Sequence, residues 1–336
     1  GERRASAILG ILLCLLSGVG ANGDHATSLL ECPEYLSRES VPSVVRNFLR
    51  RVAPAVAALP IGSFREGNNV VMLLEPRKHP CIGFVVRACL HYLPGWKLQI
   101  MHGRDNLEFV KQHLLADCAA HDCTEQLENV TFTDTVPLLE RMDVSQYPPW
   151  LMERWVTQLA ALNHSDPNKE WSFNRLVHSG LMLDVGFWNA VQGEMVFVVQ
   201  TDGWLCQTGL ERYLHLDYLG APWHHCLIKP GSYLCHGQNG GLSLRRKSKM
   251  LSMMTNQRSL EMEDFQLAAW FMRHGANILT FNESRELFVE TVTPTSYDTV
   301  LGLHKFWVYQ SYHSMVSLCD HCMKDLTPPP PPPPPT

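Results

Sequence analysis

The chain has 336 residues, which is room for one large α/β domain or two small ones. Of these residues 45% are hydrophobic and 18% are charged, so the chain can bury a sizeable core. The formal net charge of −5 gives no overall basic field of the kind that attracts nucleic acid or acidic lipid, and no nucleic-acid partner is expected. The local basic run Arg245-Arg246-Lys247 is interpreted as a solvated surface.

The first 22 residues have the composition of a targeting segment. Arg3 and Arg4 precede an apolar run at residues 5–16, and small residues follow up to Ala21. The run is shorter than the roughly 18–20 residues that a spanning helix needs. We therefore expect a signal peptide or a short signal anchor over residues 1–22, with membrane anchoring in the second case. Either one predicts a glycoprotein of the secretory pathway lumen (ER or Golgi) or a secreted one.

The cysteines and glycosylation signals agree with that compartment. Without Cys14, which lies in the targeting segment, ten cysteines remain, and this number suggests disulfides. Close pairs such as Cys118/Cys123 and Cys226/Cys235 are candidate disulfides, and the full connectivity is left open. Three acceptor sequons begin at Asn129, Asn163 and Asn282.

Residues 23–66 are predicted to be a helical stem or lead-in, and residues 67–318 the core domain. Within the lead-in, residues 41–59 have apolar residues at helical spacing, and Pro54 is expected to interrupt the helix. The core domain opens with a continuous apolar run at residues 70–74, typical of a strand buried on both faces. A helix, a strand and a second helix are expected next, at residues 81–92, 97–101 and 106–116. This β-α-β-α order predicts a parallel, Rossmann-type sheet.

The later elements are less regular. We expect helices at residues 150–162 and 260–274, and strands at residues 195–200 and 278–281. Residues 319–336 are predicted to form a C-terminal tail whose eight consecutive prolines adopt polyproline II. Cys319-Asp320-His321-Cys322 lacks a second cysteine pair at metal spacing, so a disulfide or free thiols are favoured over zinc.

Three groups of polar residues lie where a ligand is expected. Asp202 follows the strand predicted at residues 195–200, and ligands of open α/β sheets bind at such strand ends. It is a candidate metal or nucleotide contact, or else only a turn residue. Asn239-Gly240-Gly241 lets backbone amides approach sugar hydroxyls or phosphate, and is equally typical of a hairpin turn.

The loop after the first strand carries Glu75 and Arg77. In a Rossmann-like sheet this loop often meets the nucleotide, and Arg77 can pair with phosphate through two parallel hydrogen bonds. The alternative is a surface ion pair that contributes little to stability. Trp223 and Trp307 are candidates for stacking on sugar faces, although tryptophan is more often a core residue.

Eight blocks of residues, in this order, resemble a family of GT-A-like glycosyltransferase domains whose acceptors are mostly undefined. They span about residues 70–310 and comprise Leu74-Glu75-Pro76-Arg77-Lys78-His79-Pro80, Gly95-Trp96-Lys97 through His102-Gly103-Arg104-Asp105-Asn106, Ser172-Phe173-Asn174-Arg175 with Phe187-Trp188, Gln200-Thr201-Asp202, Asp217-Tyr218-Leu219-Gly220-Ala221-Pro222-Trp223, Asn239-Gly240-Gly241-Leu242-Ser243-Leu244-Arg245, Glu263-Asp264 and His304-Lys305-Phe306-Trp307. The resemblance implies an α/β, GT-A-like fold with a Rossmann-type, mostly parallel central sheet flanked by helices.

The resemblance also implies a metal site. GT-A enzymes usually place Asp-x-Asp at the end of the strand, and a divalent metal held there neutralises the diphosphate leaving group. Here Gln200 stands in place of the first Asp, so Asp202 and His304 are the expected ligands of Mn²⁺ or Mg²⁺. An imidazole ligand favours Mn²⁺.

Asp264 is the expected general base, with Glu263 as its substitute. In the resembled family this acid removes the proton of the acceptor hydroxyl during inverting transfer. The alternative is that both acids only favour the positive end of a helix dipole, which also predicts an ionised Asp264 at neutral pH.

The resemblance implies a glycosyltransferase that moves a sugar from a nucleotide-sugar donor to a hydroxyl group of a glycan, protein or lipid. UDP-linked sugars are the first donors to consider. The alternatives are a catalytically inactive glycan- or nucleotide-binding module of the same fold, and a secreted hydrolase suggested by the histidines and acids.

Overall fold

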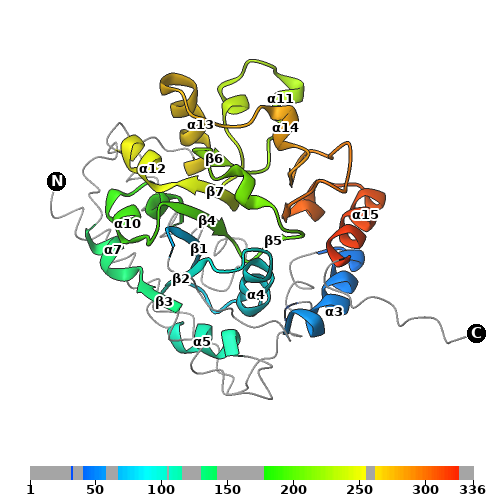
Figure 1. Ribbon diagram of the computed structural model, residues 1–336, viewed down its shortest axis with the longest axis horizontal. Coiled ribbons are helices and arrows are strands. Elements are labelled where there is room, and N and C mark those ends of the chain that lie inside the picture. Colours follow the sequence, from blue (N-terminus) through cyan, green and yellow to red (C-terminus); the bar gives the residue numbers. More distant parts are fainter. Residues whose placement is uncertain are drawn as a thin grey trace, which may run out of the picture.

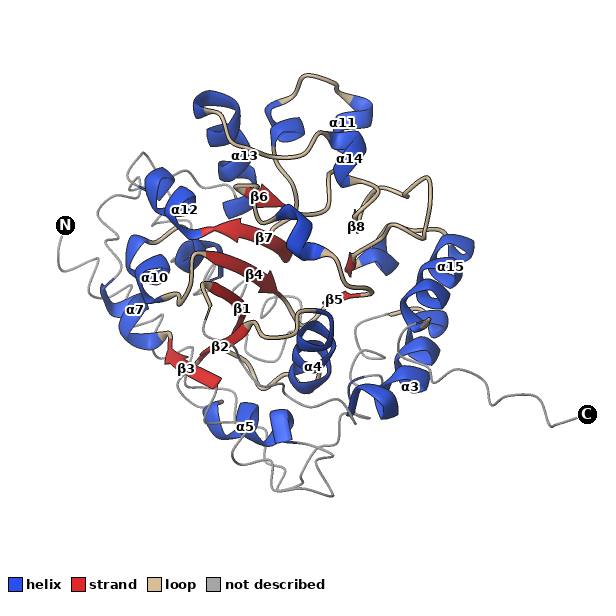
Figure 2. Cartoon of the chain, viewed as in Figure 1, coloured by secondary structure: helices blue, strands red, loops and turns tan. Residues whose placement is uncertain are grey.

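A six-stranded sheet in the order β3-β2-β1-β4-β7-β6 forms the centre of the molecule (Figures 1 and 2). The computed structural model describes residue 32 and residues 41–57, 67–103, 106–115, 130–141, 178–254 and 262–324. Strand β1 (Asn69–Glu75) pairs in parallel with β2 (Lys97–His102) and β4 (Met195–Val199), and β2 pairs in parallel with β3 (Val130–Asp134). Strand β7 (Leu242–Arg246) runs antiparallel to β4 and to β6 (Tyr218–Leu219). The predicted α/β class with a mostly parallel central sheet is confirmed.

Helices cover both faces of this sheet because its strands are apolar on both sides. Val71 and Leu73 of β1 pack into one hydrophobic cluster, whereas Val70 and Met72 pack into the other. The first cluster takes in α3 (Ser43–Ala57), α4 (Ile82–Tyr92), α5 (Leu107–Leu115) and α15 (Tyr312–Met323). The second takes in α10 (Val185–Ala190), α12 (Lys247–Met254) and α13 (Glu263–His274).

A second, three-stranded sheet lies beside the first and has the order β5-β9-β8. Strand β9 (Gly302–His304) is antiparallel to β5 (Gly203–Leu205) and parallel to β8 (Phe288–Val289). Its register places Gly203 opposite His304, so segments about 100 residues apart in sequence become neighbours. The shorter helices are α7 (Val136–Arg141), η2 (Leu210–Tyr213), α11 (His225–Ile228), η3 (Tyr233–His236), α14 (Phe281–Ser284) and η4 (Phe306–Val308).

The β-α-β-α order predicted at the start of the core domain is confirmed, and two local predictions are wrong. Helix α3 continues through Pro54 instead of being interrupted there, at the cost of the one hydrogen bond that the proline nitrogen cannot donate. No strand forms at residues 278–281: Ile278 makes a single bridge, and Thr280 and Glu283 form a capping box that starts α14. The targeting segment, the helix at residues 150–162 and the proline run lie outside the described residues.

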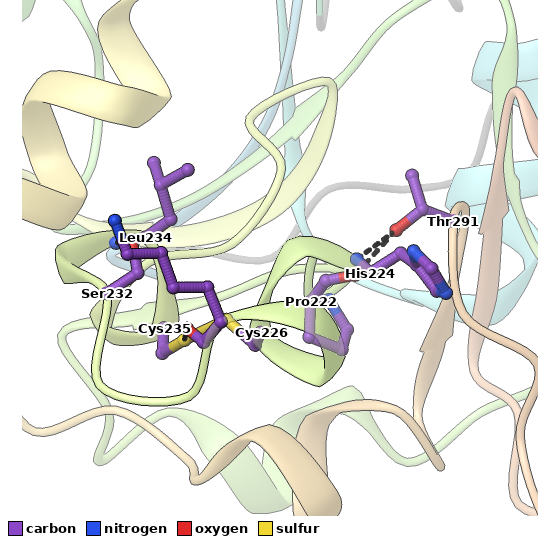
Figure 3. The surroundings of a disulfide bond; sticks show 8 residues. Pro222, His224, Cys226, Ser232, Leu234, Cys235 and Thr291 are labelled. Carbon is purple, nitrogen blue, oxygen red and sulfur yellow. Dashed lines mark hydrogen bonds between the residues drawn. A yellow bond between two sulfur atoms is a disulfide. The ribbon is translucent and has the colours of Figure 1, made fainter.

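Three disulfides link six of the eight described cysteines. Cys226–Cys235 confirms the predicted pair and closes the loop that carries α11 and η3 (Figure 3). The other two bridges join Cys32 to Cys81 and Cys206 to Cys322. Within the Cys319–Cys322 pattern, one cysteine is therefore in a disulfide, and Cys319 is a buried free thiol, as is Cys89. The predicted pair Cys118/Cys123 lies outside the described residues.

Two further observations concern the predicted lead-in and the membrane. Helix α3, part of that lead-in, packs against α4 and α15, and Figure 1 shows α3 and α15 side by side. Among the described residues, no helix combines the length and the apolar character that crossing a membrane requires. The domain boundaries given above stay a prediction.

Candidate active site

The predicted site residues gather at one edge of the central sheet, where β1 and β4 end. Glu75 is the last residue of β1, and Asp202 follows β4 by three residues. Because β7 runs antiparallel, the glycine pair that precedes it lies at the same edge, and the amide of Gln200 donates to the carbonyl oxygen of Gly241 (2.9 Å). From β1 the sheet continues to β2 on one side, while β4 leads to β7 on the other. The site therefore lies at a topological switch point, where open α/β sheets bind ligands.

Asp202 and His304 are in direct contact. The distance from Asp202 Oδ1 to His304 Nε2 is 3.1 Å. Although burial alone would lower it, the carboxylates of Asp202 and Glu290 raise the pKa of His304 to about 10. Burial would raise the pKa of Asp202, but the His304 imidazolium holds that pKa well below its usual range. The pair is thus ionised, and 24% of the Asp202 side chain remains exposed to a ligand.

Backbone strain directly after His304 supports this contact. Lys305 has a φ of 45°, and among the described residues it is the single non-glycine residue with a positive φ. Its amide donates to the carbonyl oxygen of Asp202 (2.9 Å). The left-handed conformation therefore turns the chain out of β9 while fixing the backbone of both members of the pair.

Gln200 stands between two histidines. Its Oε1 lies 3.3 Å from His304 Nε2, and its Nε2 lies 3.3 Å from the Nε2 of His178. Burial lowers the pKa of His178, so that imidazole is neutral and accepts from the Gln200 amide group. The residue that replaces the first Asp of the Asp-x-Asp pattern thus orients an oxygen atom toward the Asp202–His304 pair.

The glycine pair is packed too closely for larger residues. A Cβ on Gly241 would collide with His304 Nε2 and Gln200 Oε1, and one on Gly240 would collide with Glu263 Oε1. The Gly241 amide donates to the side chain of Asn239 (2.7 Å), which fixes the turn. The pair separates the Asp202–His304 contact from the acidic start of α13.

Glu263 is held by a buried arginine. Arg245 NH2 donates to Glu263 Oε1 (3.3 Å) and to the carbonyl oxygen of Gly240 (2.9 Å), and Ser179 donates to Glu263 Oε2 (3.1 Å). Burial alone would raise the pKa of Glu263, but Arg245 and the hydrogen bond from Ser179 lower it. Arg245 is fully buried, so the interpretation of its basic run as a solvated surface is wrong at this position. It lies on the second-cluster face of β7, above Trp188 and Tyr218.

Asp264 has a different environment. It is buried, and Oδ1 accepts from the amide of Phe265 (2.9 Å), while the described residues supply it with no ion pair. Burial and the nearby carboxylates of Glu263 and Glu290 raise the pKa of Asp264 to about 8. The expectation that the helix dipole keeps Asp264 ionised at neutral pH is therefore wrong, because desolvation and like charge outweigh the dipole. A base with its pKa near the operating pH is well matched to proton abstraction.

Glu75 and Arg77 form an ion pair, as the alternative predicted, but it is not a surface pair because the Glu75 carboxylate is buried. Arg77 donates through Nε to Glu75 Oε1 and through NH2 to Oε2, both at 2.8 Å. Glu75 is buried and also accepts from the hydroxyl of Thr201 (3.3 Å), while 30% of the Arg77 side chain is exposed. Glu75 thus fixes Arg77 beside the loop that leads to Asp202.

The geometry of Asp202 and His304 fits two of the ligands of a divalent metal, with the remaining ligands supplied by other groups. Octahedral ligands at roughly 2.1 Å from an ion lie about 3 Å from each other, close to the 3.1 Å between Asp202 Oδ1 and His304 Nε2. Apart from its ion pair with His304, Asp202 Oδ1 is a buried oxygen with no hydrogen-bond partner among the described residues. Among the described residues, no three or more His, Cys, Asp or Glu side chains form a metal cluster. Gln200 Oε1 and phosphate oxygens of a donor would have to supply the remaining ligands.

The two predicted tryptophans belong to the core. Trp307 stacks on Trp204, with ring centroids 6.0 Å apart and planes inclined by 17°, and Trp223 packs edge-on against Phe265. Both are 8% exposed. The sequence did not reveal His178 and Glu290, which belong to no motif. It also did not reveal the buried role of Arg245, for which the alternation with Leu244 in a strand was the available signal.

Comparisons with known proteins give one family profile that matches part of the chain and a set of solved structures of similar fold. The profile of the family described as "Protein of unknown function (DUF5672)" matches residues 164–298, which include Asp202, the glycine pair and Asp264 but not His304. No curated protein matches the chain in sequence. Galactosyltransferase LgtC in complex with donor and acceptor sugar analogs is similar at 10% identity and a TM-score of 0.39, covering 75% of this chain and 95% of that one.

Two further solved structures are similar to a comparable degree. An active-site mutant of LgtC shares 10% identity at a TM-score of 0.40, covering 78% of this chain and 97% of that one. Core-mannan synthase A from Aspergillus fumigatus, in an Mn/GDP form, shares 9% identity at a TM-score of 0.38, covering 80% of this chain and 89% of that one. These similarities concern the fold, so the chemistry of the site depends on the residues that this chain places there.

Proposed function

We propose that this chain is a glycosyltransferase that moves a sugar from a nucleotide-sugar donor, UDP-linked donors being the first to test, to a hydroxyl group of a glycan, protein or lipid acceptor. One observation carries the proposal: blocks separated by up to about 230 residues meet at one edge of the sheet. The Asp202–His304 pair touches Gly241, and Gly240 touches Glu263, which directly precedes Asp264. This is the arrangement that a donor site beside an acceptor base requires.

The donor is proposed to lie over the ends of β1 and β4. After His304, the positive charges of Lys305 and Arg77 also lower the pKa of Asp202, and the same charges would favour a bound diphosphate. A bound Mn²⁺ or Mg²⁺ would supply further positive charge to the leaving diphosphate, with Asp202 and His304 as its protein ligands. The backbone beside Gly240 and Gly241 lets the sugar and phosphates approach without a side chain in the way.

Asp264 is proposed as the general base and Glu263 as its support. The acceptor oxygen forms a bond to the anomeric carbon while the bond from that carbon to the diphosphate oxygen breaks. The acceptor proton moves to Asp264, and the nucleoside diphosphate leaves with the bonding electrons. Attack opposite the leaving group inverts the anomeric carbon. Glu263 is already engaged by Arg245 and Ser179, so it is less available to accept a proton.

A second candidate function is an inactive glycan- or nucleotide-binding module of the same fold. Gln200 favours it, because a neutral amide replaces a metal-binding carboxylate, and the Asp202–His304 ion pair already satisfies both charges. Binding of a nucleotide sugar without release of nucleotide, in the presence of divalent metal and a broad acceptor mixture, would support this function.

The experiment is a kinetic comparison of the wild type with Asp264→Asn on whichever nucleotide sugar the wild type cleaves or transfers. Asparagine is nearly isosteric and keeps the ability to accept from the Phe265 amide. We expect kcat to fall by roughly 10²-fold or more with little change in donor KM, because the lost group acts mainly in the transition state. A kcat within about threefold of the wild type would remove the base role from Asp264.

We further propose residence in the secretory pathway lumen or secretion. The three disulfides among the described residues fit an oxidising compartment. The sequon at Asn282 lies in α14 with its side chain exposed. Membrane anchoring through the N-terminal segment remains part of this proposal.

A further inference from the structure

Glu290 is a buried carboxylate that lies against the far side of His304. It directly follows β8, and the register of β8 with β9 pairs Val289 with Leu303, so the next residue along each strand is Glu290 beside His304. Glu290 Oε1 is 3.4 Å from His304 Nδ1, while His304 Nε2 faces Asp202 and Gln200. The imidazole is therefore placed between two carboxylates, one on each nitrogen.

The backbone around Glu290 is fixed from two directions. Gln310 Nε2 donates to the carbonyl oxygen of Glu290 (2.9 Å), and Gln310 Oε1 accepts from Thr293 (2.7 Å). The hydroxyl of Thr291 accepts from the amide of His224 (2.8 Å) and donates to the carbonyl oxygen of Pro222 (3.2 Å). Figure 3 shows this contact next to the Cys226–Cys235 disulfide. Glu290 thus has a rigid support, as a residue that orients another side chain needs.

Among the described residues, the facing polar atoms of Glu290 and His304 have no partner besides each other. Glu290 is 6% exposed and His304 is 5% exposed. Glu290 Oε2 and His304 Nδ1 are both buried atoms without a hydrogen-bond partner, and among the described residues no lysine or arginine forms an ion pair with Glu290. A buried carboxylate is costly unless a cation or donor faces it. The proton on His304 Nδ1 is the donor that the described structure offers.

We propose that Glu290 is a positioning residue that keeps the proton on His304 Nδ1, so that Nε2 is directed at Asp202 and at the donor-binding edge. The inference rests on the proposed function, in which Nε2 is a metal ligand. Metal-binding histidines generally donate their second N–H to a carboxylate or carbonyl, which fixes the tautomer and the ring orientation, and loss of that partner typically weakens metal binding 10–100-fold. The 3.4 Å separation is longer than a good hydrogen bond, and such contacts often shorten when a site is loaded.

The test compares Glu290→Ala, which removes the acceptor, with Glu290→Gln, which keeps an acceptor oxygen without the charge. Glu286→Gln is the matched control, because Glu286 lies in the same segment and accepts from the amides of Thr295 and Ser296 without facing His304. Two readouts are used: Mn²⁺ affinity by isothermal titration calorimetry, and the ¹⁵N-imidazole NMR signal of His304, assigned from its absence in His304→Gln.

We expect Glu290→Ala to weaken Mn²⁺ binding 10–100-fold and to abolish a slowly exchanging Nδ1–H signal, with Glu290→Gln intermediate and Glu286→Gln unchanged. Mn²⁺ affinity of Glu290→Ala within twofold of the wild type, or an unchanged Nδ1–H signal, would overturn the inference. If the wild type binds no Mn²⁺, the metal part of the proposed function fails, and the NMR signal of the metal-free protein alone decides the role of Glu290.

Discussion

Replacing Asp264 with asparagine changes how the stability of the protein depends on pH. The pKa of Asp264 is about 8 in the folded protein and 3.8 for a freely solvated aspartate, because burial and the neighbouring Glu263 and Glu290 disfavour the charged form. A raised folded-state pKa gives stability that is fully present below pH 3.8 and lost as the pH rises through 8. Between these limits the folded state holds one proton more than the unfolded state. The free energy of unfolding therefore falls by about 1.4 kcal/mol per pH unit from this group alone.

The asparagine of the variant does not titrate, so the difference in unfolding free energy between Asp264→Asn and the wild type isolates this contribution. We expect the variant to gain about 3 kcal/mol over the wild type between pH 5.5 and 7.5. Urea unfolding followed by tryptophan fluorescence, without reductant, measures both proteins across that range.

Glu283→Gln is the control for that measurement. Hydrogen bonds from Thr280 lower the pKa of Glu283, so its contribution is present above the unfolded pKa and is lost only in more acid solution. Its offset from the wild type should stay constant in the window. A difference for Asp264→Asn that is equally constant, within about 0.5 kcal/mol, would refute the account of Asp264.

Two other predictions follow from packing and from the cysteines. Gly241→Ala should lower turnover by at least tenfold and destabilise the fold by about 1–3 kcal/mol, because its Cβ would collide with His304 and Gln200; wild-type kinetics and melting temperature would contradict the close packing. Alkylation of the denatured, unreduced protein followed by peptide mass spectrometry should label Cys89 and Cys319. It should leave unlabelled the three disulfide pairs, Cys32–Cys81, Cys206–Cys322 and Cys226–Cys235.

Local sequence patterns were sufficient for the first half of the sheet. The run at residues 70–74 is apolar on both faces, and such a strand has few alternatives to the centre of a parallel sheet. Strand ends also located Asp202 and Glu75 at one edge, since parallel strands end on the same side. The predicted strand at residues 278–281 does not form. The Thr280–Glu283 capping box starts helix α14 there, and this local signal outweighs a short apolar run.

Other parts of the site depend on contacts that leave no local pattern. Glu290 and His304 meet only because β8 and β9 pair, and His178 reaches Gln200 from a separate segment. The predicted ionisation of Asp264 is wrong for the same reason. Its sequence position shows the helix dipole, whereas the desolvation and the Glu290 charge that outweigh the dipole come from the tertiary fold. The disulfides Cys32–Cys81 and Cys206–Cys322 span 49 and 116 residues and likewise required the structure.

The most direct test of the proposed transferase is the release of free nucleotide from a panel of nucleotide sugars, measured with Mn²⁺ and with excess chelator, for the wild type and Asp202→Asn. We expect at least one nucleotide sugar to release nucleotide in a divalent-dependent manner, and Asp202→Asn to abolish this release while its circular dichroism spectrum stays that of the wild type. Equal sugar transfer by the wild type in excess chelator would contradict the role of Asp202 and His304. Absence of release from every nucleotide sugar, with binding retained, would contradict the transferase itself.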